Sequence, residues 1–124
     1  MKGLILIILL ILTAPVFTQR AVFYTPNKTI RFPKTNEGEK LKYRYLVKNM
    51  GKVPLELYGF EAECTCTEVT LPKSPIKPGE QDFIDVTFDT NGKYYFQDRI
   101  IYLSANTRKK REKLRFKVFV IPKD

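Results

Sequence analysis

The sequence predicts an all-β, antiparallel β-sandwich of about seven strands. Short runs rich in β-branched and aromatic residues recur roughly every ten residues, with turn-forming residues between them. No long stretch shows the 3.6-residue apolar period of an amphipathic helix. Many short strands at regular spacing, without helices, are typical of domains built from two packed antiparallel sheets.

Three of the expected strands precede the cysteines. Thr29–Phe32 is a short run with alternating polar and apolar residues. In Leu41–Asn49 apolar and basic residues alternate, as on a half-buried strand. The Asn and Gly residues at 49–52 predict a turn after it. Pro54–Glu61 follows, and a strand tolerates such a proline at its start.

Four expected strands follow the cysteines. Thr65–Leu71 leads into a proline-rich connection, where Pro78–Gly79 predicts a tight turn with the glycine at a positive φ. Phe83–Phe88 alternates cleanly between apolar and polar residues. Arg99–Ala105 is apolar on both faces, which is typical of a central strand. Leu114–Ile121 alternates again, and the inward-facing set is large enough for a core without disulfides.

Residues 1–18 are predicted to be a secretory signal peptide. Lys2 gives a basic start, and Gly3–Leu12 is an apolar run well short of the roughly 20 residues that span a bilayer. Residues of modest size suit cleavage before Gln19. We therefore expect an exported protein, periplasmic or secreted, with residues 19–124 as one domain and no stable membrane span after cleavage. An uncleaved N-terminal anchor is the alternative.

The chain is strongly basic. It has 22 Lys and Arg residues against 13 Asp and Glu residues, a net charge of +9. Loss of Lys2 with the signal peptide leaves a net charge of +8. In an exported protein this charge favours an anionic surface or another envelope protein as partner, and not nucleic acid. The densest basic cluster, a candidate binding surface, consists of Arg108, Lys109, Lys110 and Arg111.

Cys64 and Cys66 are the only cysteines, with Thr65 between them. On a regular strand, residues i and i+2 lie about 6.6 Å apart. A disulfide needs Cα atoms within roughly 4.4–6.8 Å, so this pair could form one only near the stretched limit or at a bend. Two thiolates on one face could instead bind a soft metal ion such as Cu(I). The same two residues could also exchange disulfides, bond to a partner protein or remain quiet, partly buried thiols.

Several kinds of catalysis lack their usual residues. The sequence contains no histidine, which removes the commonest general base and metal ligand. It also has no glycine-rich phosphate loop. Glu61, Glu63 and Glu68 could in principle form a hydrolytic carboxylate pair, but such side chains on surface strands are mostly solvated. We expect a protein that is not an enzyme and needs no cofactor.

Tyr94, Tyr95 and Phe96 form an aromatic triple after a predicted loop. With Lys93 beside them, they could recognise a sugar ring or a peptide. They could equally cap the end of the sandwich. An exposed edge strand is another route to binding, because a partner peptide can extend the sheet by β-augmentation.

Six short motifs occur in a fixed order along the chain: Lys48–Gly51, Pro54–Leu55, Cys64–Thr67, Pro78–Glu80, Ile84–Thr90 and Ser104–Asn106. Their order and spacing resemble an exported bacterial family known as the domain of unknown function numbered fifteen seventy-three. That family is similar to Hydin-type immunoglobulin-like domains, which serve as interaction modules. Thr65 departs from the pattern, because the family usually has glycine there. The resemblance implies an immunoglobulin-like sandwich and export, and no established reaction.

We therefore expect an exported immunoglobulin-like binding or scaffolding module of the cell envelope. One alternative is a small soft-metal-binding or thiol-redox protein that uses Cys64 and Cys66. A second is a carbohydrate-binding module that uses Tyr94–Phe96.

Overall fold

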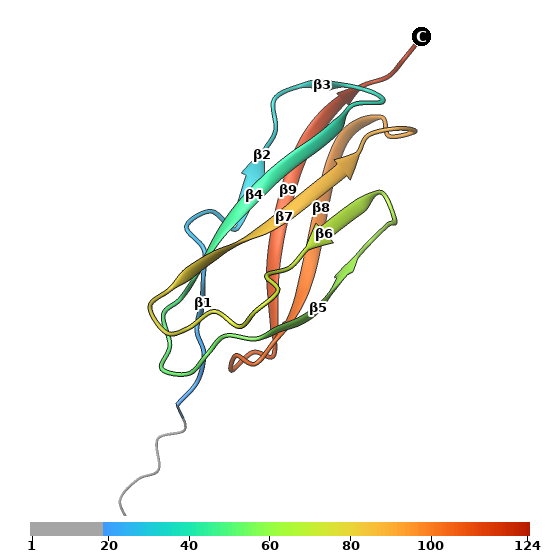
Figure 1. The fold of residues 1–124 in the computed structure, drawn as a ribbon. Coiled ribbons are helices and arrows are strands. Elements are labelled where there is room, and N and C mark those ends of the chain that lie inside the picture. Colours follow the sequence, from blue (N-terminus) through green and yellow to red (C-terminus); the bar gives the residue numbers. More distant parts are fainter. Residues whose placement is uncertain (1–18) are drawn as a thin grey trace, which may run out of the picture.

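Two β-sheets pack face to face in the computed structural model, which describes residues 19–124 (Figure 1). The predicted signal peptide, residues 1–18, lies outside the described residues. Within them the strands are β1 (Phe23–Tyr24), β2 (Thr29–Arg31), β3 (Thr35–Asn36), β4 (Lys40–Asn49), β5 (Leu57–Ala62), β6 (Thr67–Thr70), β7 (Gln81–Asp89), β8 (Tyr95–Ala105) and β9 (Arg111–Ile121).

One sheet has four strands in the order β1-β4-β7-β6, and the other has the order β2-β9-β8-β5, with β3 also paired to β9. The predicted all-β sandwich is confirmed, and each of the seven expected strands is present with shifted ends. The purely antiparallel arrangement is wrong in one place, because β2 and β3 run parallel to β9. No helix able to span a membrane occurs in residues 19–124.

Alternating side chains from both sheets fill the space between them. From the four-stranded sheet, Ile84, Val86 and Phe88 point inward and are almost fully buried, as their alternation predicts. The rings of Phe88 and Phe116 meet across the core with centroids 5.1 Å apart. The inward residues of β9, all of them buried, are Leu114, Phe116, Val118 and Val120.

Tyr45 links the two sheets by a hydrogen bond. It lies on β4 with only 1% of its surface exposed, and its hydroxyl donates to the Arg115 carbonyl of β9 over 2.8 Å. Burial raises the pKa of the Tyr45 phenol well above its usual value. The hydrogen bond therefore satisfies a polar group that would otherwise be costly to bury.

Asn49 is a fully buried amide at the end of β4. Its Oδ1 accepts hydrogen bonds from the backbone nitrogens of Gly51, at 2.9 Å, and Val22, at 3.3 Å. Its Nδ2 donates to the carbonyl oxygens of Val53, at 2.7 Å, and Ile76, at 2.9 Å. One side chain thus joins three segments that lie far apart in the sequence.

Two glycines in the motifs have defined structural tasks. Gly79 has a φ of 79° in the tight turn where Glu80 nitrogen donates to the Lys77 carbonyl over 2.9 Å, so the predicted turn is confirmed. Gly51 allows a close approach of two backbones. A Cβ at this position would overlap the Arg20 carbonyl oxygen and lie 2.7 Å from the Val22 nitrogen.

Replacement of Gly51 by alanine is expected to lower the free energy of unfolding by about 1–3 kcal/mol, because a backbone neighbour cannot move aside as a side chain can. Gly59→Ala is the matched control, since a Cβ at Gly59 has no atom within 4 Å. Its effect should stay within about 0.5 kcal/mol. Urea denaturation of the two variants measures both values, and equal losses would contradict the role given to Gly51.

Candidate functional site

The two cysteines lie in the turn between β5 and β6. The sequence-based strand Thr65–Leu71 is wrong at its start, because residues 63–66 form bends and turns and β6 begins at Thr67. The turn brings the Cα atoms of Cys64 and Cys66 to 5.2 Å, closer than on a straight strand, and the structure joins the two residues in a disulfide. It also carries the chain from the five-stranded sheet to the four-stranded sheet.

The surroundings of this turn are tightly hydrogen-bonded. The Cys64 carbonyl accepts from the Thr67 nitrogen at 3.3 Å, and the Cys66 carbonyl accepts from the Asp89 nitrogen at 2.9 Å. Cys66 is partly buried and packs against the core. Apart from glycines, only Tyr95 and Lys110 have a positive φ among the described residues, so the turn accommodates Thr65 without that conformation. No group of three or more metal-ligating His, Cys, Asp or Glu side chains occurs in residues 19–124.

The acidic residues near the cysteines form ion pairs. Glu61 Oε2 lies 2.9 Å from the Arg111 guanidinium, and Glu63 Oε2 lies 3.6 Å from that of Arg99. Arg99 points to the sandwich interior and lies over the Phe88 ring, with its Nε buried and without a hydrogen-bond partner. These two carboxylates neutralise the charges of Arg99 on β8 and Arg111 on β9, so they have a structural role.

The aromatic triple spans the boundary between a loop and a strand, whereas the carbohydrate-binding alternative took all three residues as a loop; Tyr94 alone precedes the strand. Tyr95 and Phe96 are the first residues of β8, and Phe96 is the cross-strand partner of Phe119 on β9. The Tyr95 and Phe119 rings lie with centroids 6.2 Å apart. Tyr94, Tyr95 and Phe96 are each more than half exposed, so their rings form a surface.

The basic cluster lies at the other end of the same hairpin. Arg108, Lys109 and Lys110 form the turn between β8 and β9, and Arg111 begins β9. The β8–β9 register runs from Tyr95 opposite Val120 to Ser104 opposite Arg111, which separates the two ends by roughly 30 Å. The structure therefore does not bring the aromatic triple and the basic cluster into one site.

The sequence did not indicate that β5 and β6 form the edges of their sheets on one side of the sandwich. These two edge strands are not hydrogen-bonded to each other in the sheet order. They are joined at one end by the cysteine turn. At the other end, Leu55 and Ile76 exchange two backbone hydrogen bonds of 2.8 and 2.9 Å. We call this region the open side.

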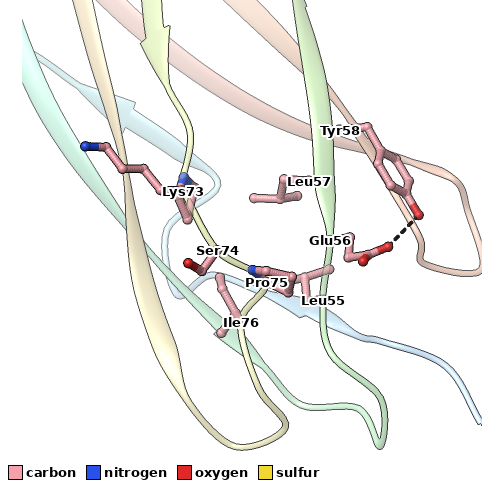
Figure 2. Close-up of a pocket in the computed structure, with 9 residues that line it drawn as sticks. Leu55, Glu56, Leu57, Tyr58, Lys73, Ser74, Pro75 and Ile76 are labelled. Atoms are coloured by element: carbon pink, nitrogen blue, oxygen red, sulfur yellow. Dashed lines mark hydrogen bonds between the residues drawn. The ribbon is translucent and has the colours of Figure 1, made fainter.

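A pocket of about 200 Å³ lies beside the Leu55–Ile76 bridge, between β5 and the proline-rich connection (Figure 2). Leu57 points from β5 toward the segment that carries Lys73 and Ser74, whereas Tyr58 points away and donates a 3.0 Å hydrogen bond to Glu56. The register of β5 against β8 shifts between Leu57 and Gly59. A glycine within an aromatic strand is the one sequence signal that could have indicated this bulge.

A family model described as Protein of unknown function (DUF1573) matches residues 23–120. The chain belongs to this family. The family predicted from the six motifs is thus confirmed, and its likeness to Hydin-type domains stays a prediction. Three motif residues have structural tasks: Asn49 forms the buried bonds described above, Thr90 donates to the Glu39 carbonyl at 2.6 Å, and Asn106 donates to the Pro54 carbonyl at 2.9 Å.

Solved structures with the same fold share little sequence with this member of the family. A protein of unknown function from Porphyromonas gingivalis W83 is 17% identical with a TM-score of 0.71 over 82% of this chain, which spans about half (47%) of that protein. The ASH / PapD-like domain 7 of human CEP192 is 14% identical, with a TM-score of 0.56 over 91% of this chain and 94% of that domain. The YadV chaperone is 14% identical, with a TM-score of 0.55 over 82% of this chain and 52% of its own.

The predicted immunoglobulin-like β-sandwich is therefore confirmed as the fold, and a PapD-like domain is among the solved structures that share it. No curated protein matches the chain. The function of this family member must therefore be argued from its surfaces, because a fold shared at such low identity carries no activity with it.

Reduction of the disulfide is expected to lower the free energy of unfolding by less than about 2 kcal/mol, since the loop-entropy gain of so short a ring is only about 1.5 kcal/mol. Urea denaturation with and without dithiothreitol, followed by tyrosine fluorescence, measures the loss. The Cys64→Ser, Cys66→Ser double variant is the control, and dithiothreitol should not change its stability. A loss above about 3 kcal/mol would show that the cross-link organises more of the fold than its own turn.

Proposed function

We propose that this DUF1573 member is an exported, non-catalytic binding module of the cell envelope that holds a partner protein at the edge of β5. The observation that carries the proposal is the character of that edge. β5 has the sequence LYGFEA, with neither lysine nor proline, and it exposes Tyr58 and Phe60 by 66% and 42%. Natural proteins protect edge strands with lysine, proline or short length, because an unprotected edge pairs with other strands.

The length of β5 also favours it over the other edges. It has six residues, whereas β6, at the edge of the other sheet, has four. The other edge of the four-stranded sheet is β1, with two residues, and the other edge of the five-stranded sheet has β2, with three. A partner strand gains main-chain hydrogen bonds in proportion to the length it pairs, so β5 offers the largest gain among the edges in residues 19–124.

Apolar side chains along the open side would be buried by an added partner strand, and their burial would stabilise the complex. Phe60 is the cross-strand partner of the fully buried Leu103, so its ring faces the inside of the sandwich at its margin. Across the open side, Val69 and Leu71 are only partly buried against the core. A strand laid along β5 would cover these side chains, and the pocket beside Leu57 would take one side chain of that strand.

Two further arguments support a binding role. The chain lacks histidine, and the soft-metal alternative requires Cys64 and Cys66 to be reduced, whereas the structure joins them in a disulfide. The YadV protein, which has a sandwich of this architecture over 52% of its chain, is a chaperone, and this likeness supports a protein-binding role here. The net positive charge would assist encounter with acidic partners in the envelope.

Export is the part of the proposal that rests on the N-terminal sequence, and it has a direct test. Mass spectrometry of the protein recovered from the periplasm or medium should give an N-terminus at Gln19, because residues 1–18 have the pattern of a cleaved signal. Recovery of the intact chain in the membrane fraction would establish the uncleaved anchor in its place.

The β5 edge is tested by in vivo photo-crosslinking in the cells that export the protein. A photo-reactive amino acid replaces Tyr58 on β5 or, as the control, Tyr24 on β1, which is 49% exposed. We expect a discrete adduct with an envelope protein from position 58 and none from position 24. Within the adduct, backbone amides of β5 should exchange hydrogen more slowly than in the free protein, because strand addition occupies them.

Phe60→Lys should reduce this adduct at least tenfold, because strand addition would bury the new charge at a cost of at least about 1.4 kcal/mol. The matched control is Phe83→Lys, which changes a phenylalanine of similar exposure, 39%, on β7. Equal adducts from positions 58 and 24, or equal effects of the two lysine variants, would refute the proposed edge.

A further inference from the structure

A shallow hollow of about 190 Å³ lies on the outer face of the five-stranded sheet, near the end of β9. Three cations and two exposed rings line it: Arg31, Lys34, Lys117, Phe96 and Phe119. Of these five residues, only Phe96 was predicted from the sequence to belong to a binding surface. The hollow lies over β2, β9 and the start of β8, whereas β5 is at the far edge of the sheet, so the hollow and the β5 edge are separate surfaces.

Strand register places these five side chains together. Arg31 on β2 is the partner of Lys117 on β9, and Phe96 on β8 is the partner of Phe119. The Lys34 ammonium lies 5.5 Å from the centre of the Phe119 ring, within the range of a cation–π contact. The result is a paired set of rings with positive charges along one side.

The positive charges of the hollow outnumber the negative charge beside them. The four ion pairs found in residues 19–124 do not include Arg31, Lys34 or Lys117. Asp98 is the cross-strand partner of Lys117, and Arg115 Nε lies 2.7 Å from its Oδ1. The hydrogen bond from Arg115 lowers the pKa of Asp98, and the charges of Lys117 and Arg31 also help to lower it, so this one carboxylate faces three cations. The ligand that complements this surface is therefore an anion.

Tyr95 adds an independent sign of a built surface. Its φ of 63° is in the left-handed region, which costs an aromatic residue of order 1 kcal/mol or more. This conformation accompanies a ring that is 62% exposed and lies beside Phe119. The strained conformation does not bury the Tyr95 ring in the core. Residues with such strained backbones cluster at ligand-binding and other functional sites.

The floor of the hollow argues against an added peptide strand. β9 pairs with β8 on one side and with β2 and β3 on the other, so its backbone groups are already used there. Recognition must come from the side chains. The hollow is also smaller than the 300–1,000 Å³ typical of drug-sized ligands, so it suits one unit of a longer molecule.

We propose that this hollow binds a carboxylated sugar unit of an acidic glycan. The Arg31 guanidinium and the Lys117 ammonium hold the carboxylate, because guanidinium groups match its two oxygens. The Phe96 and Phe119 rings contact the apolar face of the sugar ring. Lys34 lies over Phe119 and attracts a second anionic unit of the chain. The protein would thus bind an acidic polysaccharide on one face while the β5 edge remains free.

The test is isothermal titration of the exported form of the protein with oligogalacturonate at physiological salt. We expect binding at least tenfold tighter than to a neutral oligosaccharide of equal length. Lys117→Gln and Phe119→Ala should each weaken it at least tenfold. Lys113→Gln is the matched control, because Lys113 is on the same outward face of β9 but outside the hollow, and it should change the affinity less than twofold.

Three results would overturn the proposal. Equal losses from Lys113→Gln and Lys117→Gln would show a general effect of net charge. Equally tight binding of inorganic polyphosphate, unaffected by Phe119→Ala, would show an anion patch without a sugar subsite. Binding to phosphatidylglycerol vesicles without binding to oligogalacturonate would assign the hollow to a lipid surface. Phe96→Ala, which changes the other exposed ring of the hollow, gives the same readout if Phe119→Ala lowers stability.

Discussion

The buried amide of Asn49 is the contact on which the arrangement of this DUF1573 sandwich depends. It has no access to water, so each of its polar atoms would be costly to leave unpaired. Four hydrogen bonds from the side chain hold the first residues of the domain, the turn after β4 and Ile76 in fixed positions. Ile76 in turn pairs with Leu55 and closes one end of the open side. The geometry of the proposed β5 edge therefore derives from a residue in the other sheet.

The residues that identify the family and the residues that carry the proposed functions are different sets. Asn49, Gly51 and Thr90 satisfy buried polar groups or allow close backbone approach. Tyr58 and Phe60 on β5, and the hollow on the opposite side, lie outside the six motifs. The motif residues therefore account for the fold of this chain, and its binding properties depend on the separate surface residues.

Alternation along the chain predicted the fold, and it failed where alternation is too short or absent. β1 and β3 have two residues each, which is too few to show the two-residue alternation of a strand. Their parallel or antiparallel pairing depends on distant partners. Tyr95 and Phe96 followed a predicted loop, but the long register with β9 extends β8 to include them. The open side and the hollow each combine residues from separate segments, and no local pattern reports such a combination.

The parallel pairing of β2 and β3 with β9 has a mechanical consequence. In Figure 1 the described chain enters at one end of the sandwich and the C-terminus leaves at the other. Bonds such as Phe32 nitrogen to the Lys117 carbonyl and Glu37 nitrogen to the Ile121 carbonyl hold the segments of β2 and β3 beside the last strand, β9. A force that pulls the two ends apart acts along these strands, so it loads these bonds in shear and they must break together.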